Sequence, residues 1–149
     1  MNKGKEIIIK PQGQFACLGS QLVKVIESIQ DKTLNCYWLV GDVEIGAYQL
    51  GIDMNKKKLY REDKKVVKYE LDELKELILD VNQFLWGVFV AIPKEIKIDI
   101  DNLKLWSEQP YEKQIPESLV EIRTFDAEYF LVCTDDKGIR EVFEKMNLD

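Results

Sequence analysis

The fold is indicated most clearly by residues 118–146, SLVEIRTFDAEYFLVCTDDKGIREVFEKM. The first eight alternate between apolar and polar side chains, Asp126 and Ala127 suit a turn, and the next seven return as a second apolar run. Two such runs around a short turn predict a β-hairpin. Residues 134–136, Thr-Asp-Asp, then form a polar cap, and the apolar residues behind it recur at helical spacing. We therefore expect a hairpin followed by a helix at this end of the chain.

Hydrophobic patterning predicts the remaining elements. Strands are expected at 7–10, 35–40, 43–50, 83–92 and 95–100, and helices behind an N-cap at Ser20 and over 69–82. Gly41-Asp42 is expected to turn the second strand back onto the third. Residues 56–68 suit an edge strand or a loop, and 101–116 an irregular connection. Because turns join most strands, we expect an α+β fold: a single domain, 1–149, whose mostly antiparallel or mixed sheet carries about three helices.

The composition excludes several kinds of chemistry. The chain has 149 residues and no histidine, so it holds no Ser-His-Asp triad, Cys-His dyad or histidine metal site. No glycine-rich phosphate motif occurs, and we expect neither a cofactor nor a metal. Cys17, Cys36 and Cys133 are far apart among apolar neighbours, which is typical of buried reduced thiols. Cys133 is the candidate for a reactive thiol, because a helix start is expected just after it.

The start of the chain is charged, and its longest apolar run is about half of a membrane span. We therefore expect a cytoplasmic protein with no membrane partner.

Charge is distributed unevenly along the chain. The net charge of −6 divides into −1 over residues 1–55, +5 over 56–68 and −10 over 69–149. The basic strip at 56–68 suits a lysine-protected edge strand better than a nucleic-acid site, because few aromatic residues accompany it. A concentrated acidic region instead favours capture of a basic protein.

A partner-binding set follows from this pattern. Neighbouring elements could bring the acidic residues of the hairpin and the last helix to a common face, and a Trp-Tyr pair in the irregular connection could anchor a partner or pack onto the body. The expected set is Glu117, Glu121, Asp126, Glu128, Asp135, Asp136, Glu141, Trp106 and Tyr111. Trp38 and Trp86 lie in apolar runs and are expected in the core.

Two stretches carry a family resemblance. Tyr37–Glu44, with the sequence YWLVGDVE, and Val120–Met146 resemble small α+β proteins of low-GC bacteria and, more broadly, bacterial immunity proteins. The resemblance implies a small, acidic cytosolic protein that neutralises a cognate toxin by binding it. It assigns no site residue.

Three functional hypotheses result. The first is a non-catalytic immunity-type inhibitor, a monomer or weak dimer, that binds a basic toxin or nuclease domain through an acidic surface. The second is a small enzyme or ligand-binding domain that uses carboxylates, with or without a divalent metal; Asp99 and Asp101 share a strand face in this interpretation. The third is a phage-type inhibitor that mimics nucleic acid.

Overall fold

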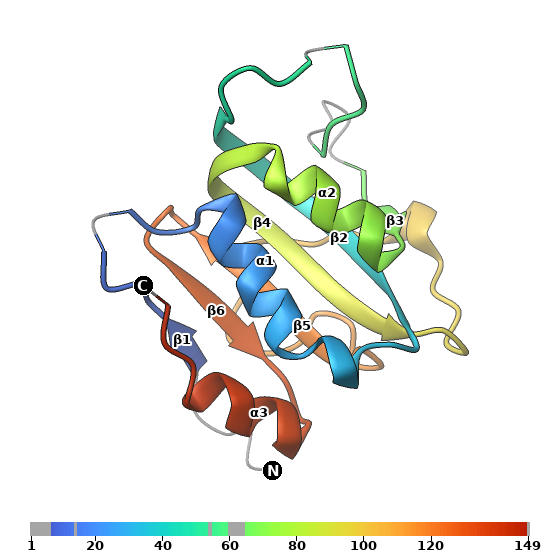
Figure 1. Ribbon diagram of the computed structural model, residues 1–149. Helices are drawn as coiled ribbons and strands as arrows, with labels where there is room; N and C mark the ends of the chain where they lie inside the picture. The colour runs from blue at the N-terminus through green and yellow to red at the C-terminus, as the bar shows by residue number, and fades with distance from the viewer. Residues whose placement is uncertain (1–6, 14, 54, 60–64, 149) are drawn as a thin grey trace.

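A computed structural model describes residues 7–13, 15–53, 55–59 and 65–148 (Figure 1). Six antiparallel strands form one sheet in the order β1-β6-β5-β4-β2-β3. The strands are β1 (Ile7–Ile9), β2 (Cys36–Tyr48), β3 (Val67–Tyr69), β4 (Val81–Pro93), β5 (Val120–Phe125) and β6 (Tyr129–Cys133). The helices are α1 (Gly19–Ser28), α2 (Leu71–Leu79) and α3 (Lys137–Glu144), with single-turn helices η1 (Gln30–Lys32) and η2 (Ile100–Asn102). The predicted α+β fold is confirmed.

The three helices pack on one face of the sheet, and α1 and α2 lie side by side across it (Figure 1). We call this the helical face. Its core contains the largest buried aromatic side chains, and each such burial contributes about 1.5–3 kcal/mol. They are Trp38, Phe84, Phe89, Phe130 and Phe143.

The opposite face is covered by an irregular chain rather than by helices. We call residues 94–119 the covering segment. It packs apolar side chains such as Leu105 and Ile115 onto Leu39 and Val90 of the sheet. The Tyr37 hydroxyl also donates a hydrogen bond to the Ile96 carbonyl at 2.8 Å. The middle of β4 is therefore buried on both faces, which explains why its sequence is a continuous apolar run rather than an alternating one.

The expected turn at Gly41-Asp42 is wrong. β2 is one continuous strand, and both of its halves pair with β4. Asp42 adopts a positive φ of 50°, and the register shifts between Gly41 and Glu44. These are the features of a β-bulge, which needs the same left-handed backbone as a tight turn. β4 is also long enough to pair with all of β2, so a bulge accommodates the two residues without reversing the chain.

The strand expected at 95–100 is also absent. The alternation of Ile96, Ile98 and Ile100 has a different cause: all three pack on the apolar cluster under the covering segment. The chain turns after β4, where the Ile96 N–H donates to the Pro93 carbonyl at 2.9 Å. An extended loop lying over a sheet face therefore shows the same alternation as a strand beside it.

The helix starts differ in their agreement with the prediction. α1 begins at Gly19 and its N-cap is Leu18, whose N–H donates to Gln21 Oε1 at 3.0 Å; the Ser20 side chain lies exposed. Asp136 does cap α3, because its carboxylate accepts the Ile139 N–H at 2.9 Å.

The predicted hairpin is confirmed as β5 and β6. Asp126 and Ala127 both have a positive φ, as a mirror-image type I turn requires, and Glu128 is an additional residue of the connection because Phe125 pairs with Tyr129. The helix expected over 69–82 is shorter, because Tyr69 belongs to β3 and β4 already starts at Val81.

Part of the basic strip at 56–68, including Arg61 and Lys64, lies outside the described residues. Across the described ranges, no helix combines the length and apolar character needed to cross a membrane.

Candidate binding surface

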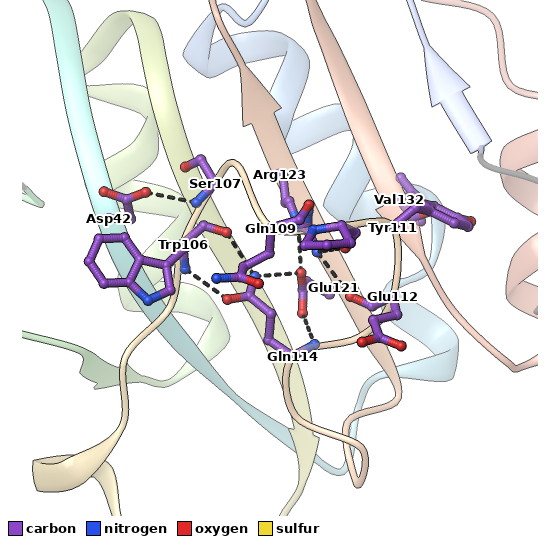
Figure 2. Close-up of polar contacts among 11 residues, drawn as sticks. Asp42, Trp106, Ser107, Gln109, Tyr111, Glu112, Gln114, Glu121, Arg123 and Val132 are labelled. Atoms are coloured by element: carbon purple, nitrogen blue, oxygen red, sulfur yellow. Dashed lines mark hydrogen bonds and ion pairs between the residues drawn. The ribbon is translucent and has the colours of Figure 1, made fainter.

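A buried ion pair on β5 holds the covering segment against the sheet (Figure 2). Glu121 and Arg123 are both fully buried, and Arg123 Nε donates to Glu121 Oε2 at 2.6 Å. The remaining guanidinium nitrogens reach three carbonyls of the covering segment. These are Gln109 at 2.6 Å, Glu112 at 2.9 Å and Pro110 at 3.3 Å. One side chain thus satisfies several backbone groups of a segment that has no strand pairing of its own.

Gln114 extends this network to Trp106. Glu121 accepts the Gln114 backbone N–H at 2.8 Å and its side-chain Nε2 at 2.9 Å. Gln114 in turn accepts the Trp106 N–H at 2.7 Å and donates to the Trp106 carbonyl at 2.9 Å. The bulge residue Asp42 accepts the Ser107 N–H at 2.7 Å, so β2 fixes the next position of the same chain (Figure 2).

Glu121 is therefore not a surface residue, and its expected place in a partner-binding face is wrong. Strand alternation places Glu121 on the face of β5 opposite the helices. The covering segment packs on that face, so Glu121 is still buried. The sequence signal was available, since Glu121 and Arg123 are two apart on a strand and must share a face.

Trp106 and Tyr111, the aromatic pair of the covering segment, differ in their exposure. The Trp106 side chain is 51% exposed and borders a surface cavity of about 560 Å³ that Lys65 and Lys104 also line. Tyr111 is instead partly buried, and its hydroxyl donates to the Val132 carbonyl at 2.9 Å. Burial raises the pKa of this hydroxyl. Tyr111 thus attaches the covering segment to β6, while Trp106 remains exposed.

The carboxylates of the expected set other than Glu121 lie at two ends of the hairpin. Asp126 and Glu128 belong to the turn between β5 and β6. The others adjoin the opposite end of β6, and they are Glu117, Asp135, Asp136 and Glu141. Five residues of β6 separate the two groups, which corresponds to roughly 16 Å at about 3.3 Å per residue. The expected set is therefore divided into two groups at opposite ends of β6.

The two groups also differ in their internal contacts. Near α3, Asp135 pairs with Lys113 at 3.0 Å and Asp136 is occupied as the helix cap. At the hairpin turn, neither Asp126 nor Glu128 forms an ion pair with any residue that the structure describes. Glu44, which lies opposite Trp86 in register, is also exposed and has no described cation as partner.

Beside these turn carboxylates, three aromatic rings lie in a row across the sheet. We call Trp86, Phe125 and Tyr129 the aromatic row. Trp86 and Phe125 are register partners on β4 and β5, with ring centroids 4.9 Å apart at an interplanar angle of 70°. Phe125 and Tyr129 pair on β5 and β6, with centroids 5.1 Å apart. All three side chains are partly exposed, so the expectation that Trp86 lies in the core is wrong.

Sequence reasoning missed this row because Trp86 stands in an apolar run. The covering segment encloses the neighbouring positions Val88 and Val90 but leaves Trp86 partly exposed. The expected two-residue turn would pair Phe125 with Glu128, whereas the structure pairs Phe125 with Tyr129, so the contact between these rings did not follow from the predicted turn.

The cysteines are enclosed, and burial raises the pKa of the Cys17 thiol to about 11. Cys133 is 2% exposed, which removes the accessibility that its expected reactivity requires. Asp99 accepts a hydrogen bond from Asn102 at 2.6 Å. Within the described ranges, no cluster of three or more Cys, Asp or Glu side chains could hold a metal ion.

Comparisons with protein-family models, with curated proteins and with solved structures found no match for this chain.

Proposed function

We propose that this chain is a non-catalytic binding protein that inhibits a basic toxin or nuclease domain in the manner of bacterial immunity proteins. The observation that carries the proposal is a set of three exposed carboxylates, Glu44 on β2 and Asp126 and Glu128 at the β5–β6 turn, for which the described residues supply no ion-pair partner. Carboxylates left without an internal partner are available to lysine or arginine side chains of another molecule. The net charge of −6 supports the same choice of partner.

Electrostatics gives such a protein fast and selective capture. Complementary potentials steer the partner and raise the association rate, and they disfavour acidic competitors. Exposed charges are screened over about 8 Å at physiological ionic strength, so the association rate should fall steeply as salt is added. We take the protein to act in the cytoplasm as a monomer or weak dimer.

The test uses purified protein and the purified product of the neighbouring gene, measured by surface plasmon resonance at 25 and 300 mM NaCl. We expect association at low salt with a rate constant at least 10-fold lower at 300 mM, because steered association depends on ionic strength. If the two proteins fail to associate at low salt, the proposal is abandoned. If the chain instead inhibits a nuclease competitively with DNA, its target site is the one that nucleic acid occupies.

A further inference from the structure

The aromatic row is a candidate contact site for the partner of the proposed function. Trp86, Phe125 and Tyr129 occupy successive register positions on β4, β5 and β6, so their rings follow one another across the sheet. They project from the same face as the covering segment, because Arg123 and Phe125 are two residues apart on β5. Carbonyls of the covering segment accept hydrogen bonds from Arg123, and the aromatic row lies two residues further along β5 on the same face.

Carboxylates border this row on two sides. Glu44 lies opposite Trp86 in the β2–β4 register, at the β2 side of the row. Asp126 follows Phe125 and Glu128 precedes Tyr129, so both belong to the turn that closes the row. The charged neighbour on the β1 side is Lys10, which the β1–β6 register would place beside Tyr129. The acidic surroundings are therefore concentrated around Trp86 and Phe125.

This combination fits one kind of side chain especially well. A guanidinium group is planar, stacks on aromatic faces and donates N–H groups in its plane to carboxylates. A lysine ammonium makes the charge contact but cannot stack in the same way. Rings that are partly exposed and already packed on each other present rigid faces at little further entropic cost, as binding anchors do.

We propose that Trp86 and Phe125, with Glu44, Asp126 and Glu128, form the docking site for an arginine side chain on the surface of the basic partner protein. The inference rests on the proposed function, since it names the part of the surface that the partner contacts. It excludes the carboxylates near α3 from that contact and leaves Trp106 outside it.

A peptide probe tests the site without the partner. Hexa-arginine and hexa-lysine peptides of equal charge are titrated into ¹⁵N-labelled protein at 25 mM NaCl, and the indole N–H signals of the three tryptophans are followed. Trp86→Phe assigns the Trp86 signal, while the exposed Trp106 serves as an internal comparison. We expect hexa-arginine to shift the Trp86 signal at concentrations roughly 3- to 10-fold lower than hexa-lysine requires, because only arginine stacks. An equal response to both peptides, or a larger shift of Trp106 than of Trp86, would overturn the proposal.

Two variants of equal net charge distinguish the effect of the site carboxylates from the effect of the overall charge. The site variant is Glu44→Gln/Asp126→Asn/Glu128→Gln, and the control variant is Asp31→Asn/Asp72→Asn/Glu95→Gln. Each changes the net charge from −6 to −3, and all six side chains are exposed without a described ion-pair partner. We expect the site variant to weaken hexa-arginine binding roughly 3- to 100-fold and the control roughly 2-fold or less, from the usual strength of exposed charge pairs. Equal weakening in both variants would show that net charge alone matters.

The same variants, measured against the neighbouring-gene product, keep the two proposals distinguishable. If the product binds and the site variant binds it as well as the control does, the docking site is wrong while the function stands. If hexa-arginine binds at Trp86 but the product does not associate, the function is wrong while the site stands. Far-UV circular dichroism of each variant confirms that the charge changes leave the fold intact.

Discussion

Replacing Arg123 by methionine tests whether the buried ion pair holds the covering segment. Methionine retains the length and apolar character of the arginine stem but removes the guanidinium. Glu121 then stays fully buried without its charge partner, and the covering segment loses the guanidinium hydrogen bonds to the Gln109, Pro110 and Glu112 carbonyls. We therefore expect a large loss of stability from a change that creates little empty volume.

The magnitude follows from these contacts. Removing one partner of a buried ion pair costs about 3–5 kcal/mol, because the remaining charge is uncompensated. Domains of this size have free energies of unfolding of about 5–15 kcal/mol, so the variant loses a large fraction of the total. At about 2–4 °C per kcal/mol, the midpoint of thermal unfolding should fall by roughly 6–20 °C. Replacing both members, as Glu121→Leu/Arg123→Met, should not restore stability, since the guanidinium hydrogen bonds to the covering segment stay lost and the Gln114 backbone N–H also loses its Glu121 acceptor.

Urea denaturation of the wild type, both variants and Glu144→Gln provides the measurement. Glu144 forms an exposed i,i+4 pair with Arg140 at 3.3 Å, so its loss should cost about 0.5 kcal/mol or less. Near-UV circular dichroism and tryptophan fluorescence report whether the environment of Trp106 changes before global unfolding. A cost below about 1 kcal/mol for Arg123→Met, comparable with the surface control, would refute the view that this pair secures the covering segment.

Two further outcomes are expected. Asp136→Ala should lower the free energy of unfolding by about 1 kcal/mol, because α3 loses its N-cap. Ser20→Ala should change it by less than about 0.5 kcal/mol, because the N-cap of α1 is Leu18. Equal losses for the two variants in urea titrations would contradict this assignment of the caps. Burial raises the Cys17 pKa from 9.0 to about 11, so its contribution to stability is present below pH 9 and is lost by about pH 11. Urea titrations at pH 8 and 10.5 should therefore show a smaller loss in the free energy of unfolding for Cys17→Ala than for the wild type. An equal loss in both proteins would contradict the raised pKa of Cys17.

The parts of the fold that local chemistry determines were predictable from the sequence. The hairpin at Asp126-Ala127 and the helix behind Asp136 each depend on a turn or a cap and on apolar residues within a few positions. The buried centre of β4 was equally readable, because a run that is apolar on both faces requires cover on both.

The errors arose where one pattern serves two structures. Gly41-Asp42 suits a turn and a bulge alike, and only the length of β4 decides between them. The alternation of Ile96, Ile98 and Ile100 describes a chain with one apolar side, whether that side packs beside a sheet or on top of it. Such choices depend on distant segments, which local propensity does not contain.

The candidate site was hidden for the same reason. The charge of Glu121 suggested a surface position, but the covering segment and Arg123 enclose it. The apolar surroundings of Trp86 suggested the core, but the covering segment leaves this residue partly exposed. Both assignments depend on how far one irregular segment extends over one face of the sheet.

The position of the covering segment therefore links stability to binding. Its hydrogen bonds to Arg123 and Asp42 hold it over the middle of the sheet, and the Asp42 carboxylate that accepts the Ser107 N–H belongs to the bulge in β2. The covering segment does not enclose the next row of side chains along the strands, which is the aromatic row. A complete helical cover would have buried those rings and separated them from Glu44, Asp126 and Glu128. Partial cover instead leaves packed rings beside carboxylates that no described cation neutralises, which is the combination that the proposed arginine contact uses.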